Sequence, residues 1–156
     1  MSPKLSSAIS YFIMQSRNAG QNDLTNKKLQ KLLYYAQAWN LVLRKKELFK
    51  EDFEAWVHGP AIPVVYQAFR DCGASVITID VEEKDLKNLS ADEQGLLNEV
   101  WQVYGKYDAS YLELLTHNEV PWLKARNGSM PYEASNAAIS KKAMREYYEQ
   151  KAKAQT

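Results

Sequence analysis

The sequence predicts a mainly α (α+β) fold: a compact single-domain bundle of about six or seven helices around a central buried helix, with a small two- or three-stranded β-ribbon. Three observations lead to this prediction. Apolar residues recur at three- and four-residue spacing along most of the chain, the pattern of helices packed on one side. One stretch, 25–43, is apolar over most of its circumference and therefore needs neighbours on several sides. Only two short stretches alternate apolar and polar residues as strands do.

The predicted central helix has a clear beginning and a narrow polar stripe. Thr25 is a good N-cap, because its hydroxyl can accept a hydrogen bond from a first-turn amide. The polar positions that follow fall at three- and four-residue spacing and so share one face. We expect this stripe to be the part of the helix that can touch a partner, and its members are Lys27, Gln30, Lys31 and Gln37.

The other elements follow from periodicity and from capping residues. The alternating stretches 52–58 and 75–81 predict two strands, and Gly59-Pro60 ends the first. Ser90 and Glu93 form a capping box that begins one helix, and Asp108 and Ser140 can cap two others. We expect the remaining segments to be helices over 5–16 and 62–72, a short helix beginning near Pro121 and ending at Asn127-Gly128, an irregular loop over 129–138 and a C-terminal helix over 140–156.

The composition fits a single globular domain over 1–156. Hydrophobic residues make up 46% of the chain and charged residues 25%, which are ordinary values. No apolar run approaches the roughly 18 residues that a membrane span requires, so we expect a cytoplasmic protein. The single cysteine, Cys72, cannot form an internal disulfide, and no Cys/His spacing of zinc-site type occurs. We therefore expect no metal and no cofactor.

The net charge of +1 conceals three blocks of charge. Residues 1–50 hold nine Lys or Arg and two Asp or Glu, residues 51–113 hold four and 13, and residues 114–156 hold seven and four. Such polarity indicates either a basic face for an acidic partner or blocks that meet in space and neutralise each other. We favour the second explanation.

Two histidines lie beside tryptophans and acidic residues, and they suggest one polar-aromatic cluster. Its expected members are Trp56, His58, His117, Glu119, Trp122 and Arg126. Catalysis, metal binding, ligand binding and a buried structural network are the four possible roles. Because no nucleophile motif, His-Glu-x-x-His or carboxylate pair occurs in the chain, we favour the structural network, with Glu119 paired to Arg126 and the histidines bonded to backbone carbonyls.

A helix-turn-helix is a further possibility for residues 5–43. Lys27, Lys28 and Lys31 could contact phosphates. However, a recognition helix needs a broad polar face, and bulky residues such as Tyr34 and Trp39 leave little of one. We therefore favour a solvated lysine stripe over DNA binding.

Motifs in a fixed order resemble those of the Panacea domain, also described as the SocA-like antitoxin or phage-associated GepA-like domain. The resemblance covers about 5–126 and lies in residues 24–39, 53–60 and 63–66, in Thr116-His117, in Pro121-Trp122 and in Arg126. The segment after Gly128 resembles the family only loosely.

This resemblance implies an antitoxin of a bacterial toxin–antitoxin system, commonly carried on a prophage, that neutralises a cognate toxin by direct protein–protein binding. It also implies two alternatives: an adaptor that delivers the toxin to an ATP-dependent protease, or a DNA-binding regulator of its own operon. Neither is an enzyme. The family-motif residues are bulky and suit a common scaffold, and here they are Tyr34, Tyr35, Trp39, Trp56, His58, Pro60, Tyr66, His117, Glu119, Trp122 and Arg126.

Overall fold

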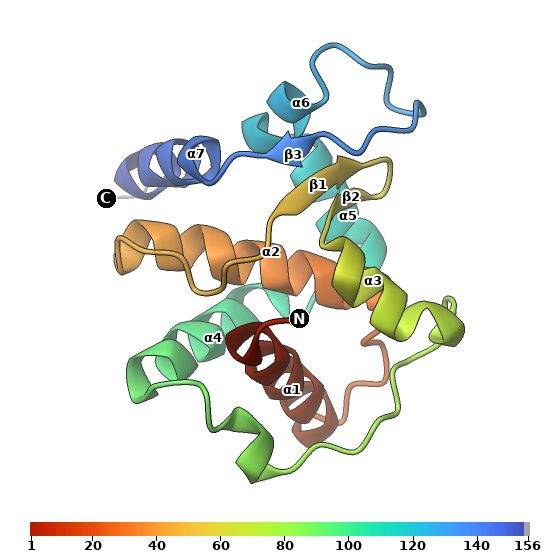
Figure 1. Cartoon of the computed structure of the whole chain (residues 1–156), viewed down its shortest axis with the longest axis vertical. Coiled ribbons are helices and arrows are strands. Elements are labelled where there is room, and N and C mark those ends of the chain that lie inside the picture. Colours follow the sequence, from red (N-terminus) through yellow and green to blue (C-terminus); the bar gives the residue numbers. More distant parts are fainter. Residues whose placement is uncertain (155–156) are drawn as a thin grey trace.

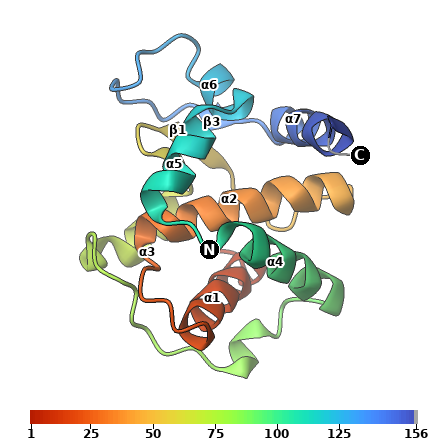
Figure 2. The ribbon, with the colours of Figure 1, turned by 180° about the vertical axis from the view of Figure 1, so that it is seen from behind.

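A computed structural model describes residues 1–154 of the chain. In these residues, seven α-helices, one of them central, accompany a three-stranded antiparallel sheet (Figure 1), which confirms the predicted fold class. Helix α7 (Lys141–Ala154) and the sheet lie on one side of the central helix α2 (Asn26–Leu43), whereas α1 (Pro3–Asn18) and α4 (Ala91–Tyr104) lie on the other. Figure 2 shows the same division from behind. No helix within 1–154 is both long and apolar enough to cross a bilayer.

Helix α2 is the core of the fold, as the sequence predicts. Fifteen of its 18 residues are buried, and the Thr25 hydroxyl accepts a hydrogen bond from the amide of Lys28 at its start. Helices α1, α3, α4, α5 and α7 and strand β2 all contact it. Tyr34 and Tyr35 are fully buried near its middle.

The polar stripe of α2 is mostly buried, so it does not offer the open face that we expected for contact with a partner. Gln30, Lys31 and Gln37 are buried, and only Lys27 is partly exposed. The reason is that irregular segments cross the helix here and offer their backbone groups. The Gln37 amide donates to the carbonyl of Phe49 (2.7 Å) and accepts from the amide of Leu48 (2.7 Å).

Gln30 does the same for the segment that leads into α3. Its side chain donates to the carbonyl of Ile62 (3.2 Å) and accepts from the amide of the same residue (2.8 Å). A glutamine side chain can bond with a backbone N–H and a backbone C=O at the same time. An extended segment that has no neighbouring strand needs both of these bonds. The stripe therefore fastens the chain to its central helix.

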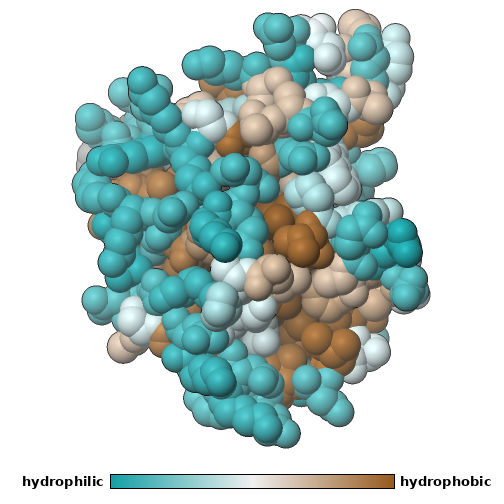
Figure 3. Space-filling view, viewed as in Figure 1, coloured by the Kyte–Doolittle hydropathy of each residue, from teal (hydrophilic) through white to brown (hydrophobic). Residues whose placement is uncertain are grey.

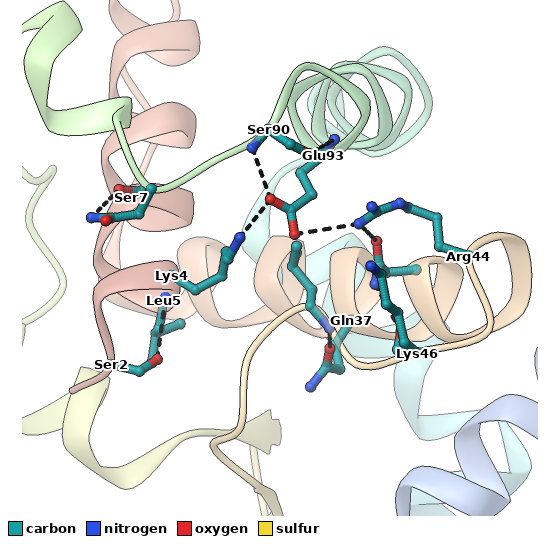
Figure 4. A network of polar contacts seen from close by, with 12 residues as sticks. Ser2, Lys4, Leu5, Ser7, Gln37, Arg44, Lys46, Ser90 and Glu93 are labelled. Atoms are coloured by element: carbon teal, nitrogen blue, oxygen red, sulfur yellow. Dashed lines mark hydrogen bonds and ion pairs between the residues drawn. The ribbon is translucent and has the colours of Figure 1, made fainter.

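A buried carboxylate joins α1, α2 and α4. Figure 4 shows Lys4 from α1 and Arg44 from the end of α2 both pointing at Glu93. The ion-pair distances are 2.6 Å from Lys4 and 3.3 Å from Arg44. Glu93 also accepts the Ser90 amide (2.8 Å), which confirms the predicted capping box of α4. These ion pairs link residues of the first, basic block to the second, acidic block, as we expected of the charge pattern.

The sheet has the order β2-β1-β3 and joins two strands from the first half of the chain to one from the second half. Strand β1 (Phe53–Trp56) pairs with β2 (Gly59–Ala61), with Ala55 opposite Pro60, and with β3 (Ala138–Ile139). The alternation predicted for β1 is present, since Phe53 and Ala55 are buried.

The second predicted strand, 75–81, does not form. Only Val76 makes an isolated bridge, to Thr25, although the amide of Ile77 also donates to the carbonyl of Leu24 (2.9 Å). Further along, Arg17 binds the carbonyls of Ile79 and Val81 from the end of α1. A guanidinium thus supplies the donors that a neighbouring strand would have supplied.

The remaining helices follow the predictions closely. Helix α3 (Pro63–Phe69) is extended by a 3₁₀ turn (Arg70–Cys72), and a second 3₁₀ turn (Glu83–Leu86) lies in the acidic loop before α4. Helix α5 (Ala109–His117) begins at the predicted cap, Asp108, and α6 is Val120–Ala125. Ser140 accepts a hydrogen bond from the amide of Ala143 in α7, and the last two residues predicted for this helix lie outside the described part.

Candidate functional site

The structure brings together four members of the predicted polar-aromatic cluster. The indole of Trp122 donates to the carbonyl of Trp56 (2.8 Å). The His117 ring stacks on this indole, with ring centroids 4.0 Å apart. The Arg126 guanidinium lies 4.7 Å from the centroid of the Trp122 ring. His58 and Glu119, by contrast, lie in other surroundings.

Arg126 fastens a loop to the sheet and does not pair with Glu119, so this predicted pair is wrong. Its guanidinium is buried and donates to the carbonyls of Ala55 (2.9 Å), Met130 (2.9 Å) and Glu133. Backbone carbonyls from two segments therefore take the place of the expected carboxylate. The fork of donors on arginine suits this task because it reaches several acceptors in one plane.

Glu119 instead joins α2 to α7. Its carboxylate accepts hydrogen bonds from the hydroxyls of Tyr35 (2.6 Å) and Tyr148 (3.0 Å) and from the ammonium of Lys151 (3.1 Å). Tyr148 and Lys151 are three residues apart on α7 and so share a face, a spacing from which this contact could have been predicted.

The tyrosines around Glu119 are held in their protonated form. Burial raises the pKa of Tyr35 and Tyr148 well above the ordinary value, and the negative charge of Glu119 acts in the same direction. Burial also raises the pKa of Tyr104, which stacks on Tyr35 at 4.0 Å, to about 12. The hydroxyls of Tyr35 and Tyr148 therefore serve as fixed hydrogen-bond donors to the carboxylate, whereas that of Tyr104 accepts from Trp39.

His58 lies on the surface, and its ring faces the carboxylate of Glu113 and not the backbone carbonyl that we expected. Its Nδ1 atom is 3.2 Å from Glu113, which also pairs with Lys27 (2.9 Å). Partial burial acts to raise the pKa of Glu113, but the hydrogen bond from Lys27 and the nearby positive charges outweigh it, and the net pKa is below the ordinary value. His117 bonds with the backbone of Val57, as expected, and burial lowers its pKa.

A hollow of about 190 Å³ lies between the first turns of α2, the β1–β2 turn and α3. Trp56 and Tyr66 form an aromatic wall, with ring centroids 5.2 Å apart. We call this feature the α2–α3 hollow, and its remaining lining residues are Asn26, Lys27, Gln30, Lys31, His58, Gly59, Ala61, Arg70 and Gly73. It therefore collects three of the family-motif residues and three of the stripe residues.

Lys31 is buried in the wall of this hollow. Its ammonium donates to the carbonyl of Pro60 (3.2 Å), and among residues 1–154 no carboxylate lies within ion-pair distance of it. Burial lowers the pKa of Lys31 to about 7, although the charge of Glu113 acts in the opposite direction. The hollow thus contains a buried amine without a counter-ion.

Gly59 makes the room that Lys31 occupies. A Cβ atom at this position would lie 2.5 Å from Cε of Lys31, and the backbone φ of +102° disfavours any residue but glycine. Our sequence reasoning missed this pair. The sequence feature that pointed to it is the Gly-Pro turn at the end of the predicted strand, since a turn that needs glycine often marks a close approach to another segment.

A second, apolar groove of about 230 Å³ lies between α2 and α4. Trp39 forms part of it and is held by a hydrogen bond from its indole to the hydroxyl of Tyr104 (2.9 Å). Leu43 and Val103 also line it and are more than half exposed. Near the first turns of α2, at its other end, Figure 3 shows further hydrophobic side chains around α3, and Val64 and Tyr66 of that helix are both 39% exposed.

In the described residues, no group of three or more His, Cys, Asp or Glu side chains is arranged to hold a metal ion.

Comparisons with known proteins agree on one family. The family model described as "Antitoxin SocA-like, Panacea domain" matches residues 29–123, from α2 to α6. Antitoxin SocA of Caulobacter vibrioides (strain NA1000 / CB15N) is 30% identical over an alignment of 131 residues, and the match covers 78% of this chain and 70% of that protein. No solved structure matches the chain.

Proposed function

Because this chain belongs to the SocA-like antitoxin family with a Panacea domain, we propose that it is an antitoxin that neutralises a cognate toxin by direct protein–protein binding. The family match over residues 29–123 is the observation that carries this proposal. The cognate toxin is expected to be the product of the adjacent gene.

The surface of the chain is compatible with binding a protein. The groove between α2 and α4 exposes Leu43 and Val103 beside the indole of Trp39, and Glu99 and Lys151 also line it. An apolar centre with a charged rim is the usual composition of a protein interface.

Co-expression tests the proposal. The product of the adjacent gene, expressed alone, should arrest growth, and this chain should restore growth and co-purify with that product. A product that is harmless alone, or that stays toxic beside the folded chain, contradicts the proposal.

The level of the toxin separates binding from delivery to a protease. Neutralisation by binding predicts that growth is restored while the toxin level stays constant, including in cells that lack the ATP-dependent proteases. A toxin level that falls only when those proteases are present would identify the chain as an adaptor instead.

The DNA-binding alternative loses the face on which it depended. Lys28 is fully buried, with its ammonium bound to Asp23 and to the carbonyl of Gly105 (2.7 Å), and Lys31 is 2% exposed. Only Lys27 remains near the surface, and Glu113 neutralises it. A mobility-shift assay with the operon's own promoter at low salt should therefore show no complex.

A further inference from the structure

The α2–α3 hollow has an excess of positive charge that its own residues do not balance. Lys27, Lys31, Arg70 and His58 line it. Glu113 pairs with Lys27, but in the described chain Lys31 and Arg70 have no carboxylate within ion-pair distance. Burial favours the neutral form of the Lys31 amine unless an opposite charge accompanies it, whereas Arg70 is exposed to water. An anion in the hollow would supply that opposite charge to both side chains.

The hollow also contains an unused hydrogen-bond acceptor. Asn26 is 6% exposed and its amide nitrogen donates to the carbonyl of Tyr66 (3.2 Å), whereas its Oδ1 atom has no partner within residues 1–154. Buried polar atoms are rarely left unpaired in folded proteins. Only a backbone or amide N–H group of an occupant, and not its carboxylate, could pair with this oxygen.

The size and walls of the hollow limit what the anion can be. Pockets for drug-sized ligands usually measure about 300–1,000 Å³, whereas this one measures about 190 Å³, which suits a single side chain. Its walls are the rings of Trp56 and Tyr66 with Ala61 and two glycines. They favour an anion carried on a short apolar stem.

We propose that the α2–α3 hollow binds one acidic side chain of a partner protein, with its carboxylate toward Lys31 and Arg70 and its stem against Trp56 and Tyr66. This inference rests on the proposed function, because it describes how the chain recognises the protein that it binds. The occupant supplies the counter-ion that Lys31 lacks and keeps the amine protonated.

Peptide titration tests the hollow without knowledge of the toxin. The probes are Ac-Ala-Glu-Ala-NH₂ and the matched Ac-Ala-Gln-Ala-NH₂, added to the whole ¹⁵N-labelled chain and followed by NMR. We expect the Glu peptide to shift the indole signal of Trp56 and the amide of Gly59 in a saturable way, and the Gln peptide to bind at least tenfold more weakly. Equal binding of the two peptides overturns the inference, as does stronger binding of inorganic phosphate.

Two variants test the cations of the hollow, and a third is the control. Lys31→Met keeps a long apolar stem and removes the amine. Arg70→Gln changes an exposed residue, so this variant tests the site even if Lys31→Met does not fold. Each of these two variants should bind the Glu peptide at least tenfold more weakly than the wild type does. Lys84→Met, which removes an exposed lysine elsewhere on the chain, should have no effect. Unchanged binding by Arg70→Gln and by folded Lys31→Met contradicts the inference.

The toxin from the adjacent gene provides the second part of the test. Arg70→Gln should weaken its binding at least tenfold, and Lys84→Met should not. If the wild-type chain binds the toxin and Arg70→Gln binds equally well, the inference fails and the proposed function stands. If the wild-type chain does not bind the toxin, the proposed function fails and the peptide result alone decides whether the hollow is an acidic side-chain site.

Discussion

Gly59 and Lys31 show at the residue scale how a turn and a helix depend on each other. The glycine has a φ of +102° and allows Cε of Lys31 to approach where a Cβ atom would stand. Any larger residue must displace the lysine or the turn, because the backbone of the turn is fixed by its pairing with β1.

We therefore predict that Gly59→Ala lowers the free energy of unfolding by about 1–3 kcal/mol. Gly20→Ala is the matched control, since Gly20 also has a positive φ, +69°, but a Cβ atom added there would meet no other atom within 4 Å. Urea denaturation of both variants measures the difference. Equal losses would mean that contact with Lys31 contributes nothing.

Lys31 also gives the fold a dependence on pH. Its pKa is about 7 in the folded chain, whereas the unfolded chain holds the proton up to about the ordinary value of 10.5. Between these values the unfolded state binds more protons, so the contribution of Lys31 to stability rises with pH from 7 to 10.5.

We expect the free energy of unfolding of the wild type, relative to that of Lys31→Met, to increase by on the order of 2 kcal/mol between about pH 7 and pH 9. Two charged groups, Lys27 and Glu113, act on Lys31. Both are present in both proteins, so their own effects on stability largely cancel in the comparison. Urea denaturation at the two pH values checks this expectation. A constant difference between the proteins would show that the Lys31 amine titrates normally.

At the scale of elements, Glu119 is the polar link between α7 and α2. It holds hydroxyls from both helices and the ammonium of Lys151. Removing one partner of a buried, hydrogen-bonded charge is costly because the others lose their acceptor.

Glu119→Ala should therefore lower the stability of the chain by about 2–4 kcal/mol. It should also speed amide hydrogen exchange in α7 and leave α1 and α4 unchanged. Glu149→Gln, at an ion pair near the surface of α7, is the control and should have little effect. Uniform acceleration of exchange over all helices would argue against a local role.

The elements that the sequence predicts best are those with local signals. The caps at Thr25, Ser90 and Asp108 mark helix starts that the structure confirms. The prediction of a strand over 75–81 is wrong because a period of two shows which residues alternate, and not whether a partner strand exists.

Side-chain partners are harder to predict because they depend on which segments cross. Gln30 and Gln37 look like solvent-facing residues until the loops that cover them are known. Likewise Glu119 and Arg126 have opposite charges and are close in the sequence, yet each finds partners on distant segments. Of the candidate site, the sequence predicts the contact of Trp56, His117, Trp122 and Arg126, but not the hollow around Lys31.

At the scale of the whole molecule, the residues that match the family model are fewer than the residues that form the folded core. The family model ends at residue 123, but β3 and α7 lie beyond it and complete the sheet and the cover of α2. Met144 and Tyr148 of α7 are almost fully buried against this core.

A chain of residues 1–128 should consequently lose cooperative thermal unfolding, because Tyr34 and Tyr35 become exposed on one side. A chain of residues 1–151, which keeps Lys151 and its contact with Glu119, is the control and should unfold cooperatively. Calorimetry distinguishes the two. A sharp transition in the shorter chain would show that residues 1–128 hold the core without β3 and α7.

The packing of α7 on α2 has a consequence for synthesis. The hydroxyls of Tyr34 and Tyr148 lie 3.3 Å apart in space, but 114 residues separate them in the chain. At ribosomal rates of about 5–20 residues per second, α2 emerges roughly 6–20 seconds before its cover. During that interval the aromatic face of the central helix is open to chaperones and proteases, so the abundance of the protein depends on how quickly its final helix is made.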